Sequence, residues 1–533
     1  MSDTNFETPA PASTLSLQLT TSSCLLQQRA GLKGYFANSQ PKIAIRLPTV
    51  NAFKLRNISA GARRRGGRLW PGGRALCRYD TIEGMRAARI GVLALAALMP
   101  AGAAEEYQVY KDHPRLLLGR SRLRLLVRER ERRTPRWRQF EALIAGKAVM
   151  PEPAFADALF YRVAGDKEAG RRAVAWALGP GGSDLRQQAL VFDWCQELLD
   201  EAQSRALAGK LRDGIERTAR DQRVPAVRAR VLAAAAVAGH APDPSAGVLE
   251  GVVKNWWEEG IAARLKAGTD PLSRADYYAL FELLHVLRDN LEIDLRESAP
   301  DYFKEAAVRQ LLSYYPAAYP AGEGEYRIPA MPGGGEPDLT RAALARAADM
   351  AIVAYDLNAP GGQVLQGWLM HDRFQLRSPF GAPYEFLWAN PYQPGLSYYH
   401  VPLVFHDDQY GRLFVRSSWD ENAAWLGTVD GEVQTFQSGR IGVLDAKAAR
   451  GPLGLAEATV YFASPGLKFR ARMERQELAF VLGLKARQKY LVEVDDQEMR
   501  EQTADPGGIL RLILPHHAET GFRLREAAPR SKK

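Results

Sequence analysis

The chain has 533 residues, of which 46% are apolar and 25% charged, as is usual for a soluble globular protein. This length exceeds what one hydrophobic core usually supports, so we expect two domains. The formal charge of +10 would suggest nucleic acid or a membrane as partner. However, residues 1–84 contain 12 Lys or Arg and only 4 Asp or Glu. The chain after Ala104 contains 57 basic and 57 acidic residues. The charge is therefore confined to the N-terminal segment, and we predict no nucleic-acid partner.

Residues 1–84 do not resemble a domain. They contain scattered Ser, Thr and Gln and an Arg-Gly-rich stretch at 61–74, without sustained periodicity. Because a signal sequence cannot act behind 84 residues, we expect translation to begin at Met85. The alternative is a translated, disordered basic arm that binds anionic polymers.

A secretory signal peptide is predicted at 85–104, from Met85 to about Ala103. Two arginines are followed by an apolar run at 90–99 and an Ala-x-Ala type cleavage site. The run is half the roughly 20 residues that a membrane-spanning helix needs. We therefore expect a periplasmic or secreted protein with no stable membrane span after signal removal.

The mature part of the chain contains a single cysteine, Cys195, so no intramolecular disulfide is possible there. Its neighbours are apolar, and we expect a buried thiol.

The first region of the mature chain, 105–390, is predicted to be helical. Apolar residues recur at helical spacing, with short breaks rich in Gly, Pro and Asp. The expected helices are 121–133, 153–163, 184–199, 201–220, 224–239, 246–266, 273–291, 299–315, 338–356 and 363–370. About ten consecutive helices are typical of a bundle, a solenoid or an (α/α) toroid. The sequence has no fixed repeat length, which argues against a solenoid, and we predict a toroid.

The second region, 391–530, is predicted to be rich in β-strands. Short β-branched or aromatic runs alternate with turn residues such as Asp-Gly and Pro-Gly. The expected strands are 411–416, 425–429, 441–444, 458–462, 478–482, 490–494 and 509–514. We predict an antiparallel β-sandwich of about seven strands, which makes the chain a multidomain α+β protein.

Three motifs carry a resemblance to a known family. They are Asp-His-Pro-Arg-Leu-Leu-Leu at 112–118, Ala-Leu-Val-Phe-Asp-Trp at 189–194, and Leu-Phe-Val-Arg-Ser-Ser-Trp-Asp at 413–420 followed by Trp-Leu-Gly at 425–427. With the helical-then-strand layout, they resemble the heparinase II/III and alginate lyase group of polysaccharide lyases, over roughly 105–480. The resemblance implies an (α/α) toroid followed by a β-sandwich, and β-elimination on an acidic, uronate-containing polysaccharide or oligosaccharide.

One departure from this family concerns the segment 430–440. Members of the family usually carry a Gly-rich loop with a His-x-His-x-Asp type motif there, but this segment has no histidine. The alternative is therefore a non-catalytic carbohydrate-binding relative.

The expected helix 273–291 carries the first candidate catalytic residues. Tyr278, Glu282, His285 and Asp289 fall on one face of it. A uronate lyase needs a group that neutralises the carboxylate, a base and an acid, and Tyr and His can serve as the last two. We predict Tyr278 and His285 as catalytic residues. The alternative is a core tyrosine and a histidine hydrogen-bonded structurally to Glu282 or Asp289.

A second cluster, of Trp368, His371, Asp372 and Arg373, precedes an aromatic joint at 374–400. We predict that His371 supplies the missing imidazole and that Arg373 binds a carboxylate bidentately. The alternative is a helix C-terminus with a basic residue that complements its dipole.

Aromatic and amide side chains are predicted to contact the sugar, because domain joints commonly hold ligand sites. The predicted substrate-binding residues are Asn255, Tyr384, Trp388, Asn390 and Tyr399.

Two further possibilities remain. Acidic residues of the loop 323–338 could serve glycoside hydrolysis. His400 and the run 406–408 (His-Asp-Asp) could meet a metal, but their spacing is diagnostic of no ion, and we predict neither metal nor cofactor.

Overall fold

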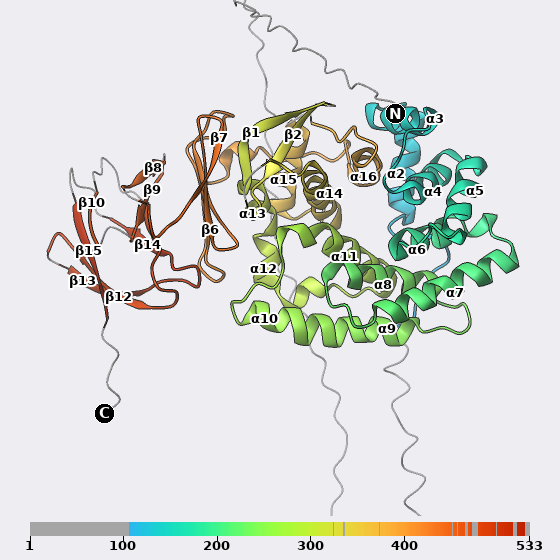
Figure 1. The fold of residues 1–533 in the computed structure, drawn as a ribbon, viewed down its shortest axis with the longest axis horizontal. Coiled ribbons are helices and arrows are strands. Elements are labelled where there is room, and N and C mark those ends of the chain that lie inside the picture. The colour runs from blue at the N-terminus through green and yellow to red at the C-terminus, as the bar shows by residue number, and fades with distance from the viewer. Residues whose placement is uncertain are drawn as a thin grey trace, which may run out of the picture. The chain divides into compact units, whose positions relative to one another are not determined.

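A computed structural model describes residues 106–527 except 323, 334–335, 372–373, 450, 456, 464–466, 472–477, 497 and 515–519. The predicted arm at 1–84 and the predicted signal peptide at 85–104 lie outside the described residues, as does Arg373. All described residues belong to one compact unit, Gly91–Lys533. The chain passes from helices to strands, as the α+β prediction requires (Figure 1).

Helices dominate as far as Trp388. They are α2 (Arg120–Glu131), α3 (Pro135–Ala145), α4 (Pro153–Ala164), α5 (Lys167–Leu178), α6 (Leu185–Trp194), η1 (Gln196–Leu198), α7 (Glu201–Thr218), α8 (Val224–Val237), α9 (Ser245–Gly251), η2 (Val252–Ala262), α10 (Ala263–Lys266), η3 (Arg274–Asp276), α11 (Tyr277–Leu291), η4 (Leu295–Ser298), α12 (Pro300–Lys304), α13 (Ala306–Leu312), α14 (Leu339–Tyr355), α15 (Pro360–His371) and α16 (Gly381–Trp388). Each of the ten predicted segments overlaps one or more of them. The sequence prediction missed α3, α5, α16 and the short helix η4.

Aspartates fix the start of several helices. The carboxylates of Asp166, Asp184, Asp200 and Asp338 accept hydrogen bonds from backbone N–H groups of the first turns of α5, α6, α7 and α14. At Asp200 the Gln203 side chain accepts in return from the Asp200 N–H group, which completes a capping box.

A two-stranded antiparallel hairpin separates α13 from α14. It consists of β1 (Tyr314–Ala321) and β2 (Gly324–Pro329). The prediction of helix to residue 315 was wrong here, because Pro316 has no N–H group and disfavours helix at the residue before it.

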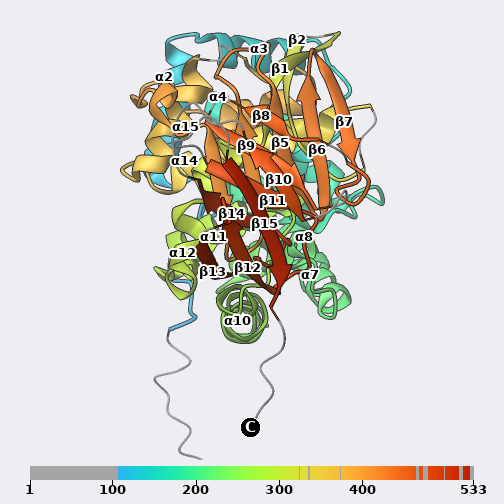
Figure 2. The same ribbon diagram turned by 90° about the vertical axis from the view of Figure 1, so that its left-hand side faces the viewer.

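The strand-rich region holds three further sheets, seen in another view in Figure 2. Their strands are β3 (Val404–Asp407), β4 (Arg412–Arg416), β5 (Trp425–Val429), β6 (Glu432–Gln437), β7 (Arg440–Leu444), β8 (Leu453–Leu455), β9 (Ala458–Phe462), β10 (Lys468–Ala471), β11 (Leu478–Leu482), β12 (Lys489–Val494), β13 (Glu498–Thr503), β14 (Leu510–Ile513) and β15 (Thr520–Glu526). The orders are β3-β4-β5-β6-β7, β14-β11-β9-β8 and β10-β15-β12-β13. All seven predicted runs are strands. The β9–β11 pair is parallel, because β10 between them in sequence belongs to another sheet.

Alternating side chains join the sheets to their neighbours. On β4, Phe414 belongs to the core shared with the helices, while Leu413 and Val415 belong to the core shared with β9 and β11. Trp425 on β5 donates from its indole N–H to the Leu312 carbonyl at 2.8 Å. The helices and the first sheet therefore form one continuous core.

Among the described residues, no helix has the length and apolarity to cross a bilayer.

Candidate functional site

A small pocket of about 50 Å³ lies where the helices, the β1–β2 hairpin and the first sheet meet. Its described lining residues are mostly aromatic or cationic. They are Tyr314, Tyr315, Pro316, Arg327, Trp368, His371, Tyr398, Arg416, Trp419 and Glu421. The pocket brings together three features that the sequence presented separately: the end of α15, the aromatic joint, and the strand motif at 413–420.

Arg416, the last residue of β4, is the most unusual member of the pocket. It is 4% exposed, its Nε donates to the Ser418 carbonyl at 2.9 Å, and its guanidinium carbon lies 4.4 Å from the centroid of the Trp419 ring. Within the described part of the chain, no carboxylate lies within 4 Å of this cation. Burial, reinforced by repulsion from Arg327, lowers the pKa of Arg416 to about 10. An unpaired buried cation is costly, and a bound anion would remove the cost.

Trp419 adds a second unused donor. Its indole Nε1 is buried and has no acceptor in the described structure. Its ring packs edge-on against Tyr398 at 5.1 Å. Because buried donors nearly always have a partner, Trp419 and Arg416 together favour a ligand that carries acceptor oxygens.

His371 ends α15 at the pocket. Its ring centroid lies 5.6 Å from that of Tyr398 and 5.9 Å from that of Tyr399. The side chain is exposed, and neither ring nitrogen has a hydrogen-bond partner among the described residues. Imidazole is the side chain best suited to proton transfer near neutral pH.

Tyr399, another predicted site residue, is 54% exposed and lines a neighbouring cavity of about 530 Å³. Trp419 lines both cavities, so they are neighbours. The small pocket has room for a single charged group, whereas the larger cavity has room for sugar rings.

Tyr278 lies on α11, away from this pocket, in a closed interior network. Its hydroxyl donates to Glu282 and accepts from Arg186 Nη2 at 3.2 Å and from Trp388 Nε1 at 3.1 Å. Burial and the Glu282 carboxylate raise the pKa of Tyr278 well above 10. This is the environment of the core tyrosine that the sequence left open as an alternative.

The charges of this network are compensated. Glu282 is fully buried and accepts from both Arg186 and Arg228. Burial raises the pKa of Glu282, but the two arginines outweigh burial and bring it to about 2. Tyr384, a predicted substrate contact, donates to Glu152, which pairs with Arg186 at 3.1 Å. Tyr384 and Trp388 therefore serve this network.

His285 is also enclosed, at 4% exposure. Its Nε2 lies 3.0 Å from the Ala351 carbonyl and its Nδ1 lies 3.3 Å from Arg288 Nη2. Burial lowers the pKa of His285 to about 3, which keeps the ring neutral. The partners are thus Ala351 and Arg288, not Glu282 or Asp289.

The two predicted asparagines lie apart from His371. Asn255 is in η2 and lines a separate cavity of about 460 Å³ together with Trp256. The Asn390 side chain accepts from the Tyr392 N–H group at 3.2 Å, and its carbonyl accepts from Gln366 at 2.9 Å. Asn390 therefore holds the backbone of the aromatic joint against α15 through hydrogen bonds.

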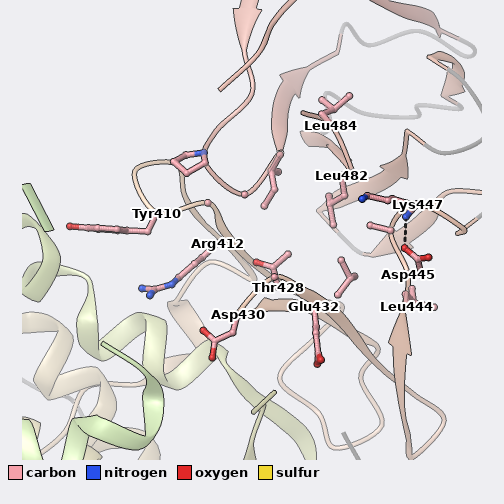
Figure 3. Close-up of a pocket in the computed structure, with 18 of the residues that line it drawn as sticks. Tyr410, Arg412, Thr428, Asp430, Glu432, Leu444, Asp445, Lys447, Leu482 and Leu484 are labelled. Atoms are coloured by element: carbon pink, nitrogen blue, oxygen red, sulfur yellow. Dashed lines mark hydrogen bonds between the residues drawn. The ribbon is translucent and has the colours of Figure 1, made fainter. Parts of the chain in front are cut away.

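A larger pocket of about 780 Å³ lies between the first two strand-region sheets (Figure 3). Figure 3 shows Arg412 and Asp430 on one side and Leu444, Leu482 and Leu484 on the other. Arg412 is ion-paired with Asp270. Because this half-buried cation already has a carboxylate partner, this pocket offers less to an anionic ligand than the Arg416 pocket does.

Several of the residues considered for metal binding or hydrolysis have protein partners. His406 pairs with Asp505 at 2.9 Å, and Asp407 lies 3.8 Å from Arg309. Glu336 accepts from Tyr319 at 2.7 Å, while Glu323 lies outside the described residues. Over the described residues, no group of three or more His, Cys, Asp or Glu is arranged to hold a metal ion.

Sequence reasoning did not select Arg327, Arg416 or Trp419 as site residues. A signal for two of them was present, since Arg416 and Trp419 belong to the strand motif on which the resemblance rests. An arginine that ends an apolar strand is placed against the core and needs either a partner or a ligand.

No family model matches the chain, and no curated protein matches it either. The geometry of the Arg416 pocket is therefore the basis for assigning a function.

Proposed function

We propose that this protein is an exported polysaccharide lyase that cleaves an acidic, uronate-containing polysaccharide by β-elimination. The observation that carries the proposal is the buried guanidinium of Arg416, which has no carboxylate partner among the described residues and lies beside the unused indole N–H of Trp419. A uronate carboxylate matches both donors.

Neutralising this carboxylate is the first requirement of the reaction. The proton on C5 of a uronate becomes acidic only when the charge that develops on the carboxylate is stabilised. Arg416 takes this role, since Arg327, which also lines the pocket, has its Nη2 paired with Glu421 at 3.0 Å. Groups of this kind, aimed at developing charge in a dry pocket, contribute strongly to catalysis.

Proton transfer is assigned to His371 and Tyr398. His371 removes the C5 proton, the C4–O bond to the neighbouring sugar breaks, and a C4–C5 double bond forms. Tyr398, in ring contact with both His371 and Trp419, returns a proton to the departing oxygen. The roles predicted for Tyr278 and His285 thereby pass to residues that line the pocket.

The proposal also covers how the helices and the sheets are arranged. The helices would form an (α/α) toroid and the following sheets a sandwich, as in the heparinase II/III and alginate lyase group. The shared core between the first two sheets supports the second part. Export would follow from the predicted signal peptide.

The test is the ultraviolet absorbance of the C4–C5 double bond when the full chain is mixed with a panel of uronate polysaccharides. We expect Arg416→Gln to lower kcat/KM by about 100-fold or more, and His371→Gln and Tyr398→Phe to lower kcat by about 100-fold or more. Matched controls are Arg440→Gln and Tyr110→Phe, which change exposed residues elsewhere. Elimination that survives Arg416→Gln would refute the proposal.

A non-catalytic carbohydrate-binding relative is the second candidate. The small volume of the pocket and the histidine-free hairpin of β6 and β7 favour it. Binding of a polyuronate that depends on Arg416, with no rise in absorbance for any member of the panel, would identify this case.

A further inference from the structure

Helix α2 and the residue that follows it carry a row of four exposed arginines, Arg120, Arg124, Arg128 and Arg132. A spacing of four residues places them along one side of the helix, about 6 Å apart. None of the four lies within 4 Å of a carboxylate in the described part of the chain. We call these four residues the α2 arginine row.

Other arginines nearby do have protein partners. Arg133 lies 3.3 Å from Glu141, Arg136 pairs with Glu385 at 3.1 Å, and Arg130 donates to the Val163 carbonyl at 2.6 Å. The arginine row is therefore a distinct set on this helix. Like charges four residues apart on a helix destabilise it, and an anionic ligand would relieve that repulsion.

An aromatic ring lies against the row. The guanidinium carbons of Arg128 and Arg132 lie 5.6 Å and 5.0 Å from the centroid of the Tyr392 ring, which is 37% exposed. Cations around an exposed aromatic ring suit a ligand that has both apolar faces and carboxylates. A uronate sugar has both.

The chain itself connects Tyr392 to the Arg416 pocket. The segment after Asn390 is held along α15, since Gln366 donates to the Asn390 and Gln393 carbonyls at 2.9 and 3.1 Å. The Leu396 N–H group donates to the Gln363 carbonyl at 2.9 Å. Tyr399 follows seven residues after Tyr392, and seven residues span at most about 25 Å. One extended ligand could therefore reach both tyrosines.

We propose that the α2 arginine row with Tyr392 is an outer binding track for an acidic polysaccharide whose reacting uronate lies at Arg416. This inference rests on the proposed function and deepens it, because a remote track favours long chains over short oligosaccharides.

Two other anionic partners fit the row less well. Leu126 is buried and the other apolar residues of α2 are half-buried, so the row lacks the exposed apolar side chains that a membrane-surface helix inserts. Duplex DNA carries one charge per about 1.7 Å, which is several times denser than a row with one charge per about 6 Å.

The test compares the full chain with a variant in which all four arginines of the row are changed to Gln. The matched control removes four exposed arginines elsewhere, by Arg171→Gln, Arg205→Gln, Arg217→Gln and Arg220→Gln. Affinity is measured by calorimetry at several salt concentrations for long polyuronates, their trisaccharides, a DNA duplex and anionic vesicles. We expect the row variant to bind long chains at least tenfold more weakly, with a shallower salt dependence, and to treat trisaccharides as the native chain does. The control should behave as the native chain with every probe.

Several outcomes would overturn the inference. The row variant could bind long chains as tightly as the native chain does, or it could lose equal affinity for long chains and trisaccharides. The native chain could fail to bind any polyuronate. Finally, DNA or vesicles could bind as tightly as polyuronates do, in a way that depends on the row. Row-dependent binding of long chains without any elimination would refute the proposed activity and leave the track standing. If the row variant and the native chain eliminate long chains equally well, the track is refuted and the proposed activity stands.

Discussion

Two buried arginines, Arg186 in the helical interior and Arg416 in the pocket, differ in whether a carboxylate compensates their charge. Both lie against aromatic rings, at 4.7 Å from Phe155 and 4.4 Å from Trp419. Arg186 is paired with Glu282 and Glu152, and the carboxylates raise its pKa against the effect of burial. Arg416 has no carboxylate partner among the described residues, and its pKa falls. The charge of Arg186 is balanced within the fold, whereas the unbalanced charge of Arg416 is the basis of the proposed ligand site.

The largest effect is expected from breaking the compensated cluster. Glu282→Gln leaves Arg186 and Arg228 with less countercharge in the interior and should lower the free energy of unfolding by about 3–5 kcal/mol. Urea denaturation measures this change. Glu201→Gln, which removes one partner of the exposed Arg205–Glu201 pair, is the control and should leave stability nearly unchanged.

The same carboxylate predicts a pH dependence. The folded pKa of Glu282, about 2, lies below the unfolded value near 4.3. Its contribution is therefore fully present above the unfolded pKa and is lost as the pH falls toward 2. The native chain should lose stability across this window more steeply than Glu282→Gln does.

A smaller effect of opposite sign is expected at Arg416. Its lowered pKa means that the folded state disfavours the cation at every pH below about 10. Arg416→Met should thus raise the free energy of unfolding at pH 7 by about 1–3 kcal/mol while it abolishes polyuronate binding. Destabilisation in this variant would contradict the contrast between the two arginines, since it would mean that the guanidinium supports the fold.

The smallest effect is expected at Asp349, whose charge is only partly compensated by its neighbours. This buried carboxylate accepts from Tyr314 at 2.5 Å, and Arg274 lies 3.9 Å away. Burial outweighs these neighbours and raises its pKa to about 6. Since the folded pKa exceeds the unfolded one, stability falls as the pH rises from about 3.9 to 6. Asp349→Asn should remove that fall and add about 1–2 kcal/mol at pH 7, with little effect below pH 4. Thermal unfolding across this range tests it.

The fold class followed from periodicity, because long amphipathic helices and short β-branched runs both leave a clear pattern. The missed helix α16 is buried on every residue, so it has no polar face to reveal a period. In α5 the buried positions are mainly small, Ala169, Gly170, Ala173 and Ala177 among them, and they give a weak apolar stripe.

The residues that line the Arg416 pocket followed from the sequence only in part. His371 and Tyr399 were selected and lie at neighbouring cavities, since His371 precedes the aromatic joint at 374–400, Tyr399 belongs to it, and sequence composition reveals this joint. Tyr278 and His285 share a helix face as predicted, but sequence spacing cannot show that Arg186, 92 residues from Tyr278, closes the network around them. Arg416 needed the fold, because only tertiary packing shows that its charge lacks a partner.

The position of Trp419 gives the protein a natural optical reporter. Its indole stacks on Arg416 and borders both cavities, so a carboxylate that engages the guanidinium changes the electric field at the ring. Ligand entry would then shift the emission of one tryptophan among the ten in the chain. Arg416→Gln keeps the indole but removes the guanidinium, so the shift should disappear in that variant, and the emission of the native chain can then report binding without a label.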